Sequence, residues 1–251
     1  MTDITVYNLI YTKADLDAAP ADERLFFLMA SSVANDTQML NKLLALTLER
    51  FDATHRFINQ GNSAQGFMIL RMLTGRLNEA WKMLASSNRM IKVNYLADLS
   101  DDAQASFRSI LAYFGSKRSL ILDVRNGVAF HHLREHVEAA YQSLDPATDL
   151  GDYLNQSIGN TLYYTTEILQ YETLKNLAGL DSQEVAITLL IQDIREQTTN
   201  FNTFLFSFAL VFAQRYLPKA LEQLKNHHEN FEAPNFEDLR LPFFFHLPNT
   251  R

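Results

Sequence analysis

The sequence predicts an all-α protein, a single helical-bundle domain of about six to eight helices. Glycine and proline, the residues that most often interrupt helices, number only 8 and 6 among 251 residues. Apolar residues recur at spacings of three and four along most of the chain, as on one face of an amphipathic helix. No internal repeat or compositional linker divides the sequence. We therefore expect residues 1–226 to form a helical domain and residues 227–251 an extended tail that packs on it.

The composition excludes several classes of protein. With 47% apolar and 20% charged residues, the chain is too hydrophobic to be disordered. The absence of cysteine excludes a disulfide scaffold, a thiolate zinc site and a cysteine nucleophile. A net charge of −7 argues against broad, non-specific binding of nucleic acid, although a local basic site would escape that argument.

The start of the chain and its apolar segments predict a cytoplasmic protein with no membrane partner. The first fifteen residues contain neither the basic segment nor the apolar segment of a secretory signal. No stretch reaches the 18 or so uninterrupted apolar residues of a membrane span.

The first elements follow from local signals. The alternation of Ile4 and Val6 allows a short extended piece. Pro20 suits the first turn of a helix, and acidic residues follow it, so we expect a helix over residues 21–56. The small polar residues 59–63 predict a loop.

The next elements are expected to be shorter. A helix should run from 64 to 85, and the polar residues 86–88 should break it before a short apolar piece at 90–96. Ser100 is a favoured N-cap residue for a following helix. Gly115 should be the glycine that lies just beyond the end of that helix.

Three further helices precede the longest one. We expect a helix that starts at Ser116 and continues to Val128, and others over residues 133–144 and 158–177. Gly179 should end the last of these, and residues 181–184 match a capping box.

The longest predicted helix begins after the capping box and reaches about residue 226, with a kink or end at Pro218. A phenylalanine-rich stripe over residues 201–212 should lie in the core. The run of three phenylalanines at 243–245 would be a liability if exposed, which favours packing of the tail.

One segment, residues 117–136, has a net positive charge in a chain whose net charge is negative. It holds four Lys or Arg, two Asp or Glu, and three of the seven His residues. Arg can pair two phosphate oxygens, His can transfer a proton near neutral pH, and Asn can orient either group. These groups could cleave RNA without a metal or other cofactor, and two copies facing each other across a two-fold axis would supply enough of them.

The same segment contains Arg125-Asn126-Gly127-Val128-Ala129-Phe130-His131. This run resembles the R-N-x-x-x-x-H form of the HEPN superfamily motif. The resemblance implies an all-α domain and a metal-independent endoribonuclease, as in toxin–antitoxin and phage-defence systems. It further implies a composite site formed by two protomers, and hence a homodimer, with RNA as substrate and an antitoxin protein as a potential partner.

The resemblance assigns phosphate binding to Arg125, a polar supporting role to Asn126 and general acid–base chemistry to His131. His132 is a rival for the last role, because positions seven apart on a straight helix nearly coincide in direction. The family spacing admits both, and Gly127 could distort the helix enough to favour His131. Additional substrate-binding candidates are Lys117, Arg118, Arg134 and Glu79.

Some family members carry a tyrosine two positions after the motif histidine, where a nucleotidyltransferase antitoxin modifies it. This chain has Leu133 or Arg134 there, which argues against regulation by that route. Two other functions remain open: a non-catalytic HEPN-like module that binds nucleotide, RNA or a partner protein, and an unrelated helical protein that recruits a partner through its aromatic tail.

Overall fold

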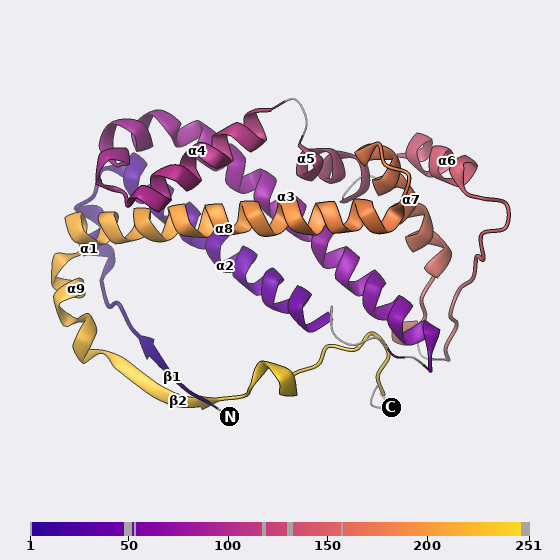
Figure 1. The fold of residues 1–251 in the computed structure, drawn as a ribbon. Helices are drawn as coiled ribbons and strands as arrows, with labels where there is room; N and C mark the ends of the chain where they lie inside the picture. The colour runs from indigo at the N-terminus through magenta and orange to yellow at the C-terminus, as the bar shows by residue number, and fades with distance from the viewer. Residues whose placement is uncertain are drawn as a thin grey trace. The chain divides into compact units, whose positions relative to one another are not determined.

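The computed structural model is mostly helical, as the sequence predicts (Figure 1). It describes residues 2–47, 52, 54–116, 119–129, 133–156 and 158–246. Within these ranges the α-helices are α1 Lys13–Asp17, α2 Ala21–Thr47, α3 Arg56–Asn94, α4 Asp101–Gly115, α5 Leu120–Val124, α6 Arg134–Ser143, α7 Tyr164–Ala178, α8 Gln183–Tyr216 and α9 Pro218–Gln223; the strands are β1 Thr2–Tyr7 and β2 His228–Ala233. None of these helices is both long enough and apolar enough to cross a membrane.

The chain divides into two compact units. The first comprises Met1–Asp36, Glu79–Ser116 and Gln197–Leu239, and the second comprises Thr37–Asn78, Lys117–Glu196 and Arg240–Arg251. The three long helices α2, α3 and α8 each contribute a part to both units.

The phenylalanine stripe of α8 lies in the core of the first unit, as predicted. The side chains of Phe204 and Phe208 are fully buried. The ring of Phe208 lies 4.7 Å from that of Phe26 in α2 and 4.4 Å from that of Tyr95, and Phe204 lies 5.2 Å from Phe107 in α4. Aromatic pairs at these distances add to the free energy gained from burying their area.

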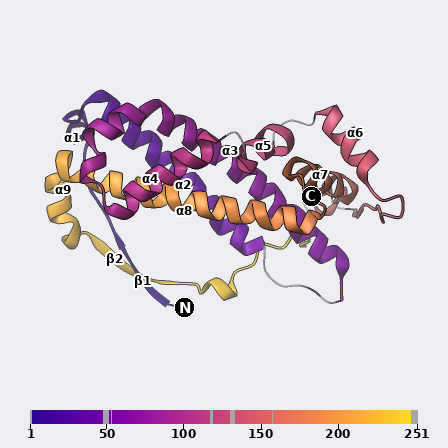
Figure 2. The ribbon, with the colours of Figure 1, turned by 45° about the horizontal axis from the view of Figure 1, so that its top comes forward.

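The two strands of the first unit form an antiparallel ribbon (Figure 2). The register pairs Thr2 with Ala233 and Tyr7 with His228, so two segments more than 200 residues apart in the sequence lie side by side. The alternation of Ile4 and Val6 correctly indicated the extended conformation. It did not identify the partner strand.

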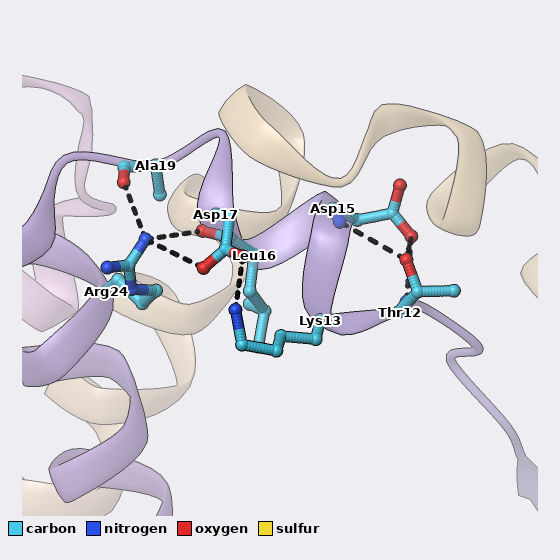
Figure 3. Close-up of polar contacts among 7 residues, drawn as sticks. All are labelled: Thr12, Lys13, Asp15, Leu16, Asp17, Ala19 and Arg24. Atoms are coloured by element: carbon cyan, nitrogen blue, oxygen red, sulfur yellow. Dashed lines mark hydrogen bonds and ion pairs between the residues drawn. The ribbon is translucent and has the colours of Figure 1, made fainter.

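A short capped helix follows the ribbon. Thr12 and Asp15 form a capping box at the start of α1, in which each side chain bonds the other residue's backbone (Figure 3). Arg24 of α2 then donates to the carbonyls of Leu16 and Ala19, and its guanidinium lies 3.3 Å from Asp17. These contacts fix the turn between α1 and α2.

The predicted interruptions of α3 are wrong, because it is one helix through residues 59–63 and 86–88. Gly61 is buried against the tail, and a Cβ there would lie 2.8 Å from the ring of Phe244. Asn62 accepts a hydrogen bond from the backbone of Phe243. Contacts made far along the chain therefore override the local loop signal. Ser86 bonds the carbonyl of Met83 and so causes no break.

Some of the predicted helix boundaries are confirmed and others are wrong. Ser100 caps α4, Gly179 ends α7 with φ +65°, and Pro218 begins α9. Gly115, by contrast, is the last residue of α4 and does not lie beyond it. The N-cap residue of α8 is Ser182 instead of the expected Asp181, because the Ser182 hydroxyl accepts a hydrogen bond from the backbone N–H of Val185. The helix expected from Ser116 starts instead at Leu120 and changes character after Val124.

Candidate functional site

The motif residues Arg125–Ala129 form a π-helical turn at the end of α5, in the second unit. Ser119 caps α5 by accepting a hydrogen bond from the backbone of Leu122. Ile121, Val124 and Val128 are buried, which anchors both the helix and the turn on the unit. Single π-helical turns are rare and occur frequently at functional sites.

Arg125 and Asn126 are joined by a hydrogen bond on this turn. The Nη1 atom of Arg125 donates to Oδ1 of Asn126 over 2.9 Å. Arg125 is half-buried and Asn126 is exposed. Among the residues that the structure describes, no carboxylate forms an ion pair with Arg125. A guanidinium has five N–H donors, so this bond leaves four of them for an anion.

Gly127 allows the turn to pack closely on its neighbours. A Cβ at this position would lie 3.0 Å from Cδ1 of Leu177 in α7 and 3.2 Å from two ring atoms of His136 in α6. A side chain here would therefore push against both helices. The close approach at Gly127 is thus made between parts of this one chain.

His136 is the residue that the sequence reasoning missed. Its Nδ1 atom lies 3.2 Å from the carbonyl oxygen of Gly127. We assign the proton to Nδ1, because a ring nitrogen must donate to a carbonyl. In the neutral ring, Nε2 is then a hydrogen-bond acceptor. The one available signal was that His136 is the third histidine of the basic segment, but its contact is with a residue of another element, nine positions earlier in the sequence.

The other predicted site residues are only partly located. Lys117, Arg118, His131 and His132 lie outside the described residues, so the choice between His131 and His132 stays a prediction. Arg134 is exposed at the start of α6. Glu79 belongs to the first unit, where its carboxylate lies 2.8 Å from Nζ of Lys82. The structure therefore joins Arg125 to Asn126 and places His136 against the backbone of Gly127 on the same turn.

A polar cavity of the second unit has a lining that does not include the motif residues. It measures about 470 Å³ and is lined by residues that include Ser143, Glu172 and Lys175. None of the predicted site residues within the described ranges lines it. Glu172 is buried there and accepts hydrogen bonds from Ser143 and Gln183, each over 2.8 Å, while it pairs with Lys175. Burial raises the pKa of Glu172, but these partners outweigh it and the net shift is downward.

No group of three or more metal-ligating side chains occurs in the described part of the chain. Comparison of the chain with models of protein families, with curated proteins and with solved structures found no match. The fold and the site thus define a helical protein that presents an arginine–asparagine pair on a π-helical turn.

Proposed function

We propose that this protein is a metal-independent endoribonuclease of the HEPN kind, with a composite site formed by two copies of the chain. The observation that carries the proposal is the Arg125–Asn126 pair. Its guanidinium is held by a neighbouring amide, has no carboxylate partner among the described residues, and sits on a π-helical turn. Such a fork suits a phosphate, whose oxygens it can pair two at a time.

The proposed reaction is transfer of a phosphoryl group within the RNA strand. One histidine takes the proton of a 2′-hydroxyl, and the resulting oxygen attacks the adjacent phosphorus. The bond from phosphorus to the 5′-oxygen breaks, and the same histidine, now protonated, gives its proton to that leaving oxygen. Arg125 stabilises the negative charge on the phosphate as it develops. The products are a 2′,3′-cyclic phosphate and a 5′-hydroxyl.

His131 is the first candidate for the proton transfers and His132 the second, as the motif implies. His136 acts as a positioning residue, because its bond to the Gly127 carbonyl holds the turn on which Arg125 lies. Lys117, Arg118 and Arg134 would add favourable charge for the RNA backbone. No residue in this scheme requires a metal.

The test is cleavage of RNA by purified protein in the presence of a chelator. Arg125→Ala should lower the rate by at least about a hundredfold, in keeping with loss of one preorganised charge-stabilising group. His131→Ala and His132→Ala decide which histidine acts. Arg89→Ala removes an exposed arginine of the first unit and should leave the rate unchanged.

Two results would overturn this proposal. One is an Arg125→Ala variant as active as the parent. The other is cleavage only when a divalent metal is added. RNA binding without cleavage at any pH would instead support a non-catalytic binding module.

A further inference from the structure

The ribbon of β1 and β2, in the first unit, has side chains of different character on its two faces. Residues that pair directly across an antiparallel ribbon lie on the same face. Ile4 pairs with Phe231 and Val6 pairs with Glu229, so these four side chains share one face. The residues between them in each strand all carry a polar group and point to the other face. One face of the ribbon is therefore mainly apolar.

This apolar face is exposed. Ile4, Val6 and Phe231 are 42%, 50% and 49% exposed. An antiparallel sheet commonly packs one face on a core, and an isolated two-stranded ribbon is at best marginally stable in water. The apolar face is thus available to a partner.

The edges of the ribbon are open as well. Within the described ranges each strand pairs only with the other, so each has one row of backbone N–H and C=O groups that faces no strand. Proteins often protect such edges with lysine, proline or a bulge. These strands contain neither lysine nor proline, and their register runs without a bulge from Thr2 to Tyr7. An extended segment can therefore add to the ribbon as a third strand.

The charges on the ribbon are all negative. Asp3, Glu229 and Glu232 are exposed carboxylates, and the two strands hold no lysine or arginine. None of the three forms an ion pair with a residue that the structure describes. A second copy of the ribbon would bring like charges together, and RNA would be repelled in the same way. A basic segment would be attracted.

A cavity of about 470 Å³ lies where β1 ends and β2 begins. Its lining includes Val6, Glu229 and Phe231 of the apolar face, together with Asn8 and His227. A lysine or arginine packs its aliphatic stem on apolar groups and keeps its charged end among polar ones. In this cavity the stem would lie on Val6 and Phe231, and the charged end would lie beside the Glu229 carboxylate.

We propose that the ribbon binds an extended, basic segment of another protein as a third strand, with one lysine or arginine of that segment in the cavity beside Glu229. Apolar residues at alternate positions of the segment cover Ile4 and Phe231. The site is independent of the proposed ribonuclease, because neither strand contains a motif residue.

The test measures the binding of fluorescein-labelled peptides to the full chain by fluorescence anisotropy. One peptide repeats Lys-Val three times, and a second has glutamate in place of each lysine. The lysine peptide should bind at least about tenfold more tightly, and its affinity should fall as salt is added, because its charges oppose those of the ribbon. A third peptide has the lysine sequence with every backbone nitrogen methylated. It cannot donate main-chain hydrogen bonds, so it should bind at least about tenfold more weakly than the lysine peptide.

Paired variants test the location. Glu229→Gln should weaken binding of the lysine peptide about threefold to fivefold, which corresponds to one exposed charge pair. Glu222→Gln is the matched control, because it removes an exposed carboxylate of α9, outside the ribbon, and it should keep the parent's affinity. Ile4→Ser should also weaken binding, whereas Val93→Ser, which changes an exposed apolar residue of α3, should not. Circular dichroism checks that each variant is folded.

Four results would each overturn the proposal. The lysine peptide does not bind the parent, or the glutamate peptide binds equally well. The methylated peptide binds as tightly as the unmodified one, which would exclude a third strand. A folded Glu229→Gln protein keeps the parent's affinity, which would place the basic peptide elsewhere on this acidic chain.

Discussion

At the scale of single residues, Gly127 shows how closely the motif turn is packed. Its missing side chain lets the turn lie against Leu177 and His136. Alanine has a helix propensity up to about 1 kcal/mol better than glycine. Overpacking a tight contact costs about 1–3 kcal/mol. The second effect is the larger one, so the packing and not the propensity should decide the outcome.

We therefore expect Gly127→Ala to lower the free energy of unfolding by about 1 kcal/mol, measured by urea denaturation. The variant should also cleave RNA more slowly if the turn positions Arg125. Gly115→Ala is the matched control: nothing lies within 4 Å of its added methyl group, and its φ is not positive. That variant should be more stable than the parent. A Gly127→Ala protein as stable as the parent would contradict the packing argument.

At the scale of elements, a buried carboxylate holds the ends of three helices together in the first unit. Glu23 of α2 accepts hydrogen bonds from Tyr95 over 2.5 Å, from Asn94 of α3 over 2.8 Å and from Tyr216 of α8 over 2.8 Å. Burial raises the pKa of Glu23, but the three hydrogen bonds and the nearby Arg215 outweigh it and lower the pKa below its ordinary value of 4.5. The ionised form is thus the one that this network stabilises.

The lowered pKa of Glu23 makes the stability of the protein depend on pH. Since the pKa of Glu23 is lower in the folded protein than in the unfolded chain, its stabilisation is complete above about pH 4.5 and is lost as the pH falls through the folded value. Glu23→Gln should lower the free energy of unfolding at pH 7 by about 1–3 kcal/mol, because the amide cannot accept every one of these bonds. Urea denaturation between pH 3 and pH 7 measures both effects.

The same titration distinguishes Glu23 from other carboxylates. Glu172 in the second unit has a lowered pKa for similar reasons, so some acid sensitivity should persist in Glu23→Gln. The double variant with Glu172→Gln should show a flatter profile than either single variant. If Glu23→Gln keeps the parent's full loss of stability on acidification, Glu23 does not contribute to it.

At the scale of the whole molecule, signals that act within a few residues were predicted best. Ser100, Gly179 and Pro218 each mark a helix end through local backbone chemistry, and the structure confirms all three. The polar residues 59–63 were wrongly predicted to form a loop, because contacts with a distant part of the chain determine their structure. Gly61 is buried by Phe244, which lies more than 180 residues further along the chain.

In the candidate site, too, the local features were predicted and the contacts between distant residues were not. A sequence motif of seven residues identified Arg125 and Asn126, and the structure shows them joined. The contact from His136 to Gly127 was beyond prediction, because it depends on how two separate elements, the π-helical turn and α6, pack on each other. The pairing of β1 with β2 depends in the same way on contacts between segments that are far apart in the sequence.

A composite site makes a prediction that no single chain could satisfy. If Arg125 of one protomer works with the catalytic histidine of the other, a dimer of one Arg125→Ala chain and one His131→Ala chain keeps one intact pair and one doubly impaired pair. Random pairing makes about half of the dimers mixed, and each mixed dimer has one intact catalytic centre out of two. We therefore expect co-expressed variants to recover about a quarter of the parent's cleavage rate, although each variant alone is inactive.

Light scattering on the same samples shows whether the chains are dimeric. His132→Ala replaces His131→Ala in the experiment if the single variants identify His132 as the acting residue. No recovery in a sample of confirmed mixed dimers would place both groups of each centre in one protomer. A monomer that cleaves RNA at the parent's rate would exclude the composite arrangement but would leave the role of Arg125 intact. The single Arg125→Ala variant tests whether the guanidinium is needed, whereas the co-expression tests only whether the guanidinium and the histidine of one centre come from different chains.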